Sequence, residues 1–150
     1  MSKSVVIAVD AMGGDNSPNK IISGISEYLK KNQNVFFRIF GNKSLIEKEI
    51  ITNNINNNFF EIIDCEDVVE NNDTPLAAAK KKKTSMWQAI NDVKEKNSHV
   101  IVSAGNTGAL FVISKLNMTM IENINKPALA ALWPNKIGMN IVLDLGANVE

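Results

Sequence analysis

The sequence predicts an α/β fold with a mainly parallel β-sheet, because short β-rich runs alternate with helix-like segments along most of its 150 residues. The first run, residues 5–9, is continuously apolar and rich in β-branched side chains, as is typical of a strand buried on both faces. Several of the predicted strands also end in glycine-rich or polar turns, which is where open α/β sheets bind their ligands.

The first half of the chain contains three predicted strands separated by two predicted helices. Apolar residues at helical spacing define the first helix, and the dipeptide Ser17-Pro18 supplies a cap and a first helical residue. In order, the expected elements are a strand at 5–9, a helix from Ser17-Pro18 to Lys31, a strand at 35–40, a helix at 44–53, a polar turn at 53–58 and a strand at 59–63.

The second half begins with an acidic, polar segment that predicts a loop. The elements expected from there on are a loop at 66–74, a helix starting at Pro75 and ending in four lysines, a helix capped by Thr84 or Ser85, a strand at 99–103, a buried helix at 109–116, and two further strands at 127–133 and 141–145. The alanine-rich segment 127–133 resembles a strand less than the others.

Composition excludes several classes of function. The 16 basic and 16 acidic residues cancel, which argues against a dedicated nucleic-acid binder. Cys65 is the single cysteine, so no intrachain disulfide forms, and we expect it to be a small buried residue. His99 is the single histidine, so a His-rich metal site or a Ser-His-Asp triad is hard to build, and we expect a structural role for it.

Two features bear on location and completeness. The apolar run at 5–9 is too short for a signal-peptide core or a membrane span, which predicts a cytoplasmic protein. The chain ends just after its last predicted strand, where a doubly wound fold continues into a helix. We therefore expect residues 1–150 to be the N-terminal part of a single α/β catalytic domain in a longer enzyme.

The first notable loop reads DAMGGD and follows the first predicted strand. Its two glycines, Gly13 and Gly14, allow positive φ and close approach of the backbone to a ligand, and the next helix begins with N–H groups that favour an anion. Asp10 and Asp15 would repel a phosphate unless they orient a lysine, cap the helix or accept a hydrogen bond from the substrate. A plain strand–helix turn explains the composition equally well.

The second loop reads SAGNTG, from Ser103 to Gly108, and leads directly into an apolar helix. Small residues, hydroxyls and an amide at a helix start favour phosphate oxygens, although a glycine-rich helix entry is equally common. The loop lacks the lysine that a Walker loop carries after its last glycine, and the chain has no G-x-G-x-x-G fingerprint.

Two weaker signals complete the set of candidate residues. Asp144 ends the last predicted strand, and Asn148 lies in the turn DLGAN, for which a plain turn is the simpler interpretation. The only basic run is 80–83, which is more often a solvated face but lies just before a helix start, where lysines can reach a phosphate or an acidic partner.

Taken together, these motifs resemble the phosphate acyltransferase family of bacterial phospholipid synthesis. The resemblance rests on the order and spacing of IAVDAMGGD (7–15), KKTSM (82–86), VSAGNTGAL (102–110), KPALA (126–130) and LDLGAN (143–148). It covers the entire chain, and several long motifs together are far more specific than any one. The lysine run and the looser acidic loop before it depart from the family's usual pattern.

The resemblance implies a fold, a reaction and partners. The fold is a three-layer α/β/α sandwich like that of isocitrate dehydrogenase and the phosphotransacetylases. The reaction transfers a fatty acyl group from acyl-acyl carrier protein to inorganic phosphate, giving acyl phosphate for phospholipid synthesis. The family implies a cytoplasmic homodimer that associates peripherally with the membrane and contacts a glycerol-3-phosphate acyltransferase. Its members are about twice the length of this chain, and it implies no metal or cofactor.

Within that family the candidate residues take expected roles. Asp10, Asp15, Asn106, Asp144 and Asn148 are the expected catalytic or site-orienting residues. The expected phosphate- or substrate-binding residues are Gly13, Gly14, Ser103, Gly105, Asn106, Thr107, Gly108, Lys81, Lys82, Lys83 and Ser85, with the lysines also able to bind an acidic carrier protein.

Other functions remain open from the sequence. A coenzyme A-dependent phosphotransacetylase would share the fold and the phosphate chemistry with a smaller acyl donor. A phosphate- or partner-binding piece, inactive on its own, is also compatible with the residues. An NAD-linked oxidoreductase of the related fold fits less well, since no nicotinamide motif is present.

Overall fold

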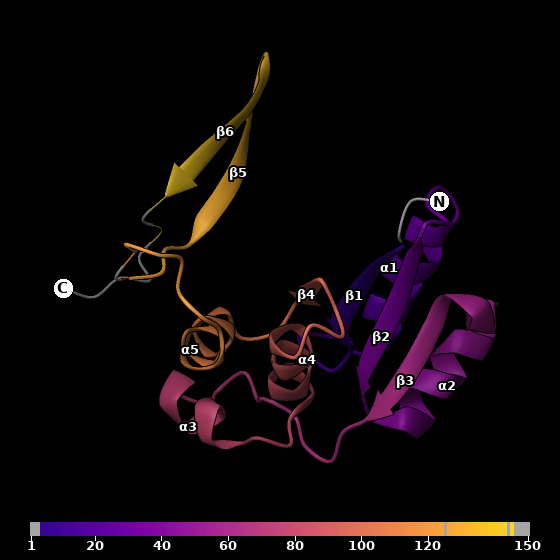
Figure 1. The fold of residues 1–150 in the computed structure, drawn as a ribbon. Coiled ribbons are helices and arrows are strands. Elements are labelled where there is room, and N and C mark those ends of the chain that lie inside the picture. The colour runs from indigo at the N-terminus through magenta and orange to yellow at the C-terminus, as the bar shows by residue number, and fades with distance from the viewer. Residues whose placement is uncertain (1–3, 125, 144, 146–150) are drawn as a thin grey trace.

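The computed structural model describes residues 4–124, 126–143 and 145. Four parallel strands form its central sheet in the order β3-β2-β1-β4 (Figure 1). These strands are β1 (Val5–Asp10), β2 (Val35–Gly41), β3 (Phe60–Asp64) and β4 (Val100–Ser103). The helices are α1 (Asn19–Leu29), α2 (Lys43–Thr52), the 3₁₀ turn η1 (Asn57–Phe59), α3 (Pro75–Lys80), α4 (Ser85–Lys94) and α5 (Thr107–Asn117). The predicted alternation and parallel sheet are confirmed.

Helices cover both faces of this sheet. Val9 and Ile39 pack with Ile22 of α1 and Ile46 of α2 in one core. The neighbouring residue Ala8 packs on the opposite face, against Ala89 of α4. Successive residues of a strand point to opposite faces, so these two clusters lie on either side of the sheet. The three-layer α/β/α arrangement is confirmed.

A third core cluster joins α3, α4 and α5 to one another beside the sheet (Figure 1). Met86, Ile90 and Ile113 are each at most 1% exposed in it. Only part of α5 is buried as predicted, because Leu116 is 67% exposed while Ile113 is fully buried.

The helix starts follow the capping rules with one correction. Asn42, Thr84 and Asn106 each accept a backbone N–H through the side chain and so cap α2, α4 and α5. The predicted cap at Ser17 is wrong, because its hydroxyl donates to the Gly13 carbonyl at 2.6 Å and α1 begins after Pro18 without a side-chain cap.

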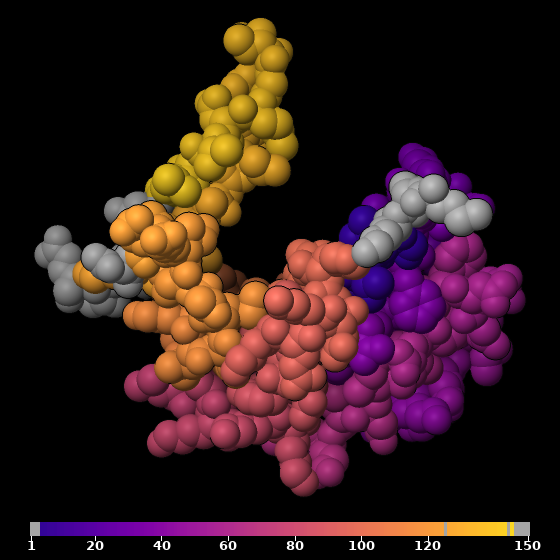
Figure 2. All heavy atoms as spheres, viewed as in Figure 1, coloured from indigo at the N-terminus to yellow at the C-terminus, as the bar shows by residue number. Residues whose placement is uncertain are grey.

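The last two strands form a separate structure. β5 (Ala130–Asn135) and β6 (Gly138–Leu143) pair antiparallel as a hairpin that projects from the body of the molecule (Figures 1 and 2). The two strands predicted at 127–133 and 141–145 are present with shifted bounds. They pair with each other and do not join the parallel sheet, since a connection of two residues suits only antiparallel neighbours. Pro134 lies inside β5, which has no second neighbouring strand in the described residues, so its missing N–H is tolerated there.

The single histidine and the single cysteine have structural environments. His99 forms two hydrogen bonds with the backbone of Val6. Its own backbone N–H donates to the Val6 carbonyl, and its Nδ1 accepts from the Val6 N–H, both at 2.9 Å. This confirms the predicted structural role. Cys65 is only partly buried, and burial raises the pKa of its thiol to about 12. In the described part of the chain, no helix has both the length and the apolar character needed to cross a bilayer.

Candidate functional site

The two glycine-rich loops lie side by side because the strands that precede them are neighbours. β1 and β4 pair in parallel, and Asp10 is level with Ser103 at their carboxyl ends. The loops that leave these ends therefore emerge at the same edge of the sheet, where α/β proteins bind ligands. The structure thus brings together residues from the first and second predicted loops.

A buried carboxylate joins the two loops. Asp10 is 1% exposed, and its Oδ1 and Oδ2 accept hydrogen bonds from the hydroxyls of Ser85 (2.6 Å) and Ser103 (2.7 Å). The backbone N–H of Met12 also donates to Oδ1, at 3.3 Å. The Ser103 oxygen in turn accepts the N–H of Gly105 at 3.1 Å. Asp10 therefore fixes both loops from beneath.

The glycines of the first loop have a packing reason. A Cβ on Gly13 would lie 2.7 Å from Asp10 Oδ2 and from the Gly105 nitrogen. A Cβ on Gly14, whose φ is +85°, would lie 2.6 Å from the Ala104 carbonyl oxygen. Real Cβ atoms do not approach so closely, so these positions require glycine for the two loops to touch. This requirement holds whether or not a ligand also approaches them.

An open pocket of about 540 Å³ lies over these loops. It is lined by the β1–α1 loop, by the start of α1, by the acidic loop before α3 and by the β4–α5 loop. The lining residues are Gly13, Gly14, Asp15, Lys20, Ile21, Asn71, Ala104, Gly105, Asn106, Thr107 and Gly108.

The start of α5 offers hydrogen-bond donors to this pocket. Asn106 Oδ1 accepts the Ala109 N–H at 3.0 Å, but the described residues provide no acceptor for the N–H groups of Thr107 and Gly108. The Thr107 hydroxyl is exposed and likewise has no hydrogen-bond partner in that part of the chain. Unpaired N–H groups at the start of an 11-residue helix attract anions.

Lys20 is a site residue that the sequence patterns did not single out. It lies in the first turn of α1 and is the only cationic residue among those lining the pocket. Its ammonium group forms no ion pair within the described residues, so its charge is available to a ligand. The available signal was its position two residues after Pro18, where a first helical turn faces the DAMGGD loop. Asp15 is the only acidic residue of the lining, and its carboxylate accepts from Asn71 Nδ2 at 3.5 Å.

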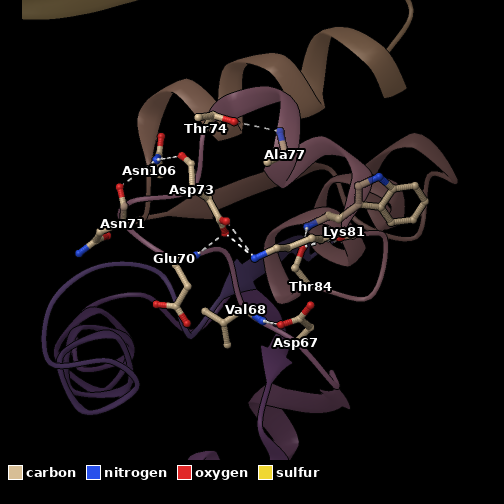
Figure 3. Close-up of polar contacts among 11 residues, drawn as sticks. Asp67, Val68, Glu70, Asn71, Asp73, Thr74, Ala77, Lys81, Thr84 and Asn106 are labelled. Atoms are coloured by element: carbon tan, nitrogen blue, oxygen red, sulfur yellow. Dashed lines mark hydrogen bonds and ion pairs between the residues drawn. The ribbon is translucent and has the colours of Figure 1, made fainter.

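Asn106 and Asp73 tie the acidic loop to the start of α5. Asn106 Nδ2 donates to the carbonyls of Asn71 (3.4 Å) and Asp73 (3.2 Å). The Asp73 carboxylate accepts from Lys81 Nζ at 2.7 and 3.0 Å and from the Glu70 N–H at 2.9 Å (Figure 3). The lysine hydrogen bond is the main reason that the pKa of Asp73 is lowered, and the same bond raises the pKa of Lys81.

The predicted lysines lie outside the pocket lining. Lys81 pairs with Asp73 and Lys83 pairs with Glu66 at 2.7 Å, which raises the pKa of Lys83. Lys82 is exposed. A direct contact of these lysines with phosphate in this pocket has no geometric support here, whereas their contact with an acidic carrier protein stays a prediction.

The other predicted residues divide into three groups. Gly13, Gly14, Gly105, Thr107 and Gly108 line the pocket together with Asp15 and Asn106. Asp10 lies beneath it and accepts hydrogen bonds from the hydroxyls of Ser85 and Ser103. Asp144 and Asn148 lie outside the described residues. Among the described side chains, no three carboxylate, imidazole or thiol groups are arranged to hold a metal ion.

Comparison with known proteins adds an independent line of evidence. The family model described as "Fatty acid synthesis protein" matches residues 5–150. The "Phosphate acyltransferase" of Pelagibacter ubique is 61% identical over 151 residues, which are 100% of this chain and 45% of that protein. The protein of the same name from Neorickettsia sennetsu is 46% identical, over 100% of this chain and 45% of its own length. The one from Caulobacter vibrioides is 40% identical, over 100% of this chain and 42% of its own length. The chain therefore spans less than half the length of these relatives.

Proposed function

This chain belongs to the family of fatty acid synthesis proteins, and we propose that it supplies the phosphate-binding part of an enzyme that transfers a fatty acyl group from acyl-acyl carrier protein to inorganic phosphate. One observation carries this proposal. Within the described residues, N–H donors without a partner at the start of α5 and Lys20, which has no ion pair there, line the same pocket, at the edge where β1 and β4 end.

The pocket suits phosphate by charge and by hydrogen bonding. The N–H groups of Thr107 and Gly108 donate to two phosphate oxygens, and the Thr107 hydroxyl donates a third hydrogen bond to the phosphate. Lys20 supplies a full positive charge that the helix terminus alone does not provide. Asp15, on the same lining, accepts a hydrogen bond from a protonated phosphate oxygen, so it orients phosphate as a nucleophile.

The reaction needs no nucleophilic side chain. A phosphate oxygen attacks the thioester carbonyl carbon from about 3–3.5 Å, the C–S bond breaks, and the carrier protein's thiolate leaves and takes up a proton. The proton that phosphate loses passes to Asp15 or to water. Donors that remain free at the loops stabilise the oxyanion that develops on the carbonyl oxygen. Asp10 acts as a positioning residue, because the hydrogen bonds that it accepts come from protein groups, namely the hydroxyls of Ser85 and Ser103 and the Met12 N–H.

The test measures acyl phosphate formation by phosphorus NMR with the enzyme at its full natural length. Lys20→Ala and Thr107→Val are expected to raise the KM for phosphate about tenfold each, since each removes a contact worth about 1–2 kcal/mol. Lys48→Ala on α2 is the matched control, because it removes an exposed lysine that is not part of the pocket lining. An unchanged KM in both site variants would refute the phosphate assignment.

The acyl donor is tested in the same assay. Turnover with acyl-acyl carrier protein and not with short acyl-coenzyme A supports the proposed donor. The reverse preference would identify a phosphotransacetylase-like enzyme. No acyl phosphate from either donor would refute acyl transfer and leave phosphate binding alone.

We also propose that the exposed lysines near the pocket attract the carrier protein. Lys82 has no ion-pair partner in the described part of the chain, and Lys83 has one only on the surface. Lys82→Glu is expected to weaken binding of an acidic carrier protein, and the difference should shrink as salt is added. Homodimer formation, peripheral membrane association and contact with a glycerol-3-phosphate acyltransferase belong to the same proposal and rest on the family alone.

A further inference from the structure

An apolar groove runs along α1 over the face of β1 and β4. It has a volume of about 410 Å³. Most of the residues that line it are aliphatic or aromatic. The lining residues used below are Ile7, Val9, Ile21, Gly24, Tyr28 and Val102. Val102 is 52% exposed on β4, the last strand of the sheet in the described part of the chain.

The groove is continuous with the candidate phosphate pocket. Lys20, Ile21 and Ala104 line both of them. From Ile21 the groove continues along α1 to Tyr28, a distance of about 10 Å at 1.5 Å per helical residue. A molecule with a polar reacting end and an apolar tail would fit with its end in the pocket and its tail in the groove.

We propose that this groove holds the fatty acyl chain of the thioester donor, an inference that rests on the proposed function. The carbonyl carbon must lie beside the bound phosphate, so the chain has to leave the pocket across its boundary. At the boundary formed by Ile21 and Ala104, the lining changes from polar groups to apolar ones. Apolar contact along the groove then favours longer chains, because more of their surface leaves water.

Gly24 gives this proposal a selective test. A Cβ at Gly24 would meet no atom within 4 Å, so a side chain can start there without a clash, and the position lines the groove. The position is within α1, where phenylalanine favours the helix more than glycine does. Gly24→Phe therefore fills the groove from the helix side, and Val102→Phe fills it from the sheet side.

The experiment compares hexadecanoyl- and butanoyl-carrier protein as donors for the full-length enzyme, with folding checked by circular dichroism. Gly24→Phe and Val102→Phe are each expected to lower the ratio of kcat/KM for the long over the short donor about tenfold or more. Glu27→Phe adds the same ring to α1 outside the groove, where the Glu27 side chain is 71% exposed, and is expected to leave the ratio unchanged.

Three outcomes would overturn the proposal. An unchanged ratio in both groove variants would place the chain elsewhere. A second apolar hollow, between α5 and the base of the hairpin, meets the pocket only at Thr107, and a changed ratio in Met118→Trp alone would assign the chain to that hollow. A native enzyme that forms no acyl phosphate with any donor would refute the proposed function itself, and the acyl groove with it.

Discussion

The hydroxyl of Ser103 donates a 2.7 Å hydrogen bond to the buried carboxylate of Asp10, and the two residues stand at the same level on neighbouring parallel strands. Through this bond the DAMGGD loop and the SAGNTG loop share one anchor. The Ser103 oxygen also accepts a hydrogen bond from the Gly105 N–H, which links Asp10 to the SAGNTG loop. The shape of the candidate pocket therefore depends on a contact that lies beneath it.

Asp10→Ala is expected to lower the free energy of unfolding by about 3 kcal/mol or more, because it leaves two hydroxyls and one N–H without their acceptor. Ser103→Ala is expected to cost about 1–3 kcal/mol, because it removes a donor to the Asp10 carboxylate and the acceptor of the Gly105 N–H. Urea unfolding of the single and double variants gives the coupling energy, for which we expect about 1–3 kcal/mol. Strict additivity of the two costs would show that the bond contributes nothing of its own.

Gly14 and Gly24 are expected to respond to alanine with opposite signs. Gly14→Ala forces a Cβ to within 2.6 Å of a backbone carbonyl at a φ of +85°, so stability should fall by about 1–2 kcal/mol from the backbone conformation alone. Gly24→Ala meets open space inside α1 and should raise stability by about 0.5–1 kcal/mol. Thermal unfolding of both variants measures the two signs, and a stabilised Gly14→Ala protein would contradict the loop geometry.

The sequence was sufficient for the architecture because its strands are short, apolar and separated by helical spacing. The same pattern implied that loops after β1 and β4 would be near one another if these strands were neighbours. The neighbour relationship itself, with β1 between β2 and β4, is a tertiary result that local patterns do not contain.

Side-chain roles in the site could be predicted less well. Asp10 was expected to orient the site, and the structure shows which hydroxyls it holds. Lys20 was missed because a lone lysine in a helix resembles any solvated residue until the adjoining loop is placed in space. The lysines at 81–83 were predicted to bind phosphate or a carrier protein because they form a basic run. In the structure, Lys81 and Lys83 are paired with carboxylates that folding brings close to them. The strands of the hairpin were predicted, but their pairing with each other was not, because strand candidates alone do not specify their partners.

The Lys81–Asp73 ion pair is expected to stabilise the acidic loop only within a pH window. The pKa of Asp73 is lowered from 3.8, so its contribution is complete above pH 3.8 and is lost as the pH falls through the lowered value. The pKa of Lys81 is raised from 10.5, so its contribution is complete below pH 10.5 and is lost as the pH rises through the raised value.

Urea unfolding across this range should therefore show a gap between the native protein and Lys81→Met that closes at both extremes. Lys83→Met is the matched comparison, because the Lys83 and Glu66 side chains are 69% and 74% exposed and such surface pairs contribute little. We expect a smaller gap for that variant. Equal gaps in the two variants would mean that the Asp73 pair does not hold the loop.

The thiol of Cys65 is expected to resist alkylation in the folded protein. Burial raises its pKa from 9.0 to about 12, so near neutral pH its thiolate is about a thousandfold scarcer than that of an unperturbed cysteine. Since the thiolate is the reactive form, labelling by iodoacetamide should be slower by a similar factor than in urea-unfolded protein. Mass spectrometry over a time course measures both rates at the same pH. Comparable rates in the two states would contradict the raised pKa, whose main cause is desolvation, with the carboxylates of Asp10 and Asp64 adding to it.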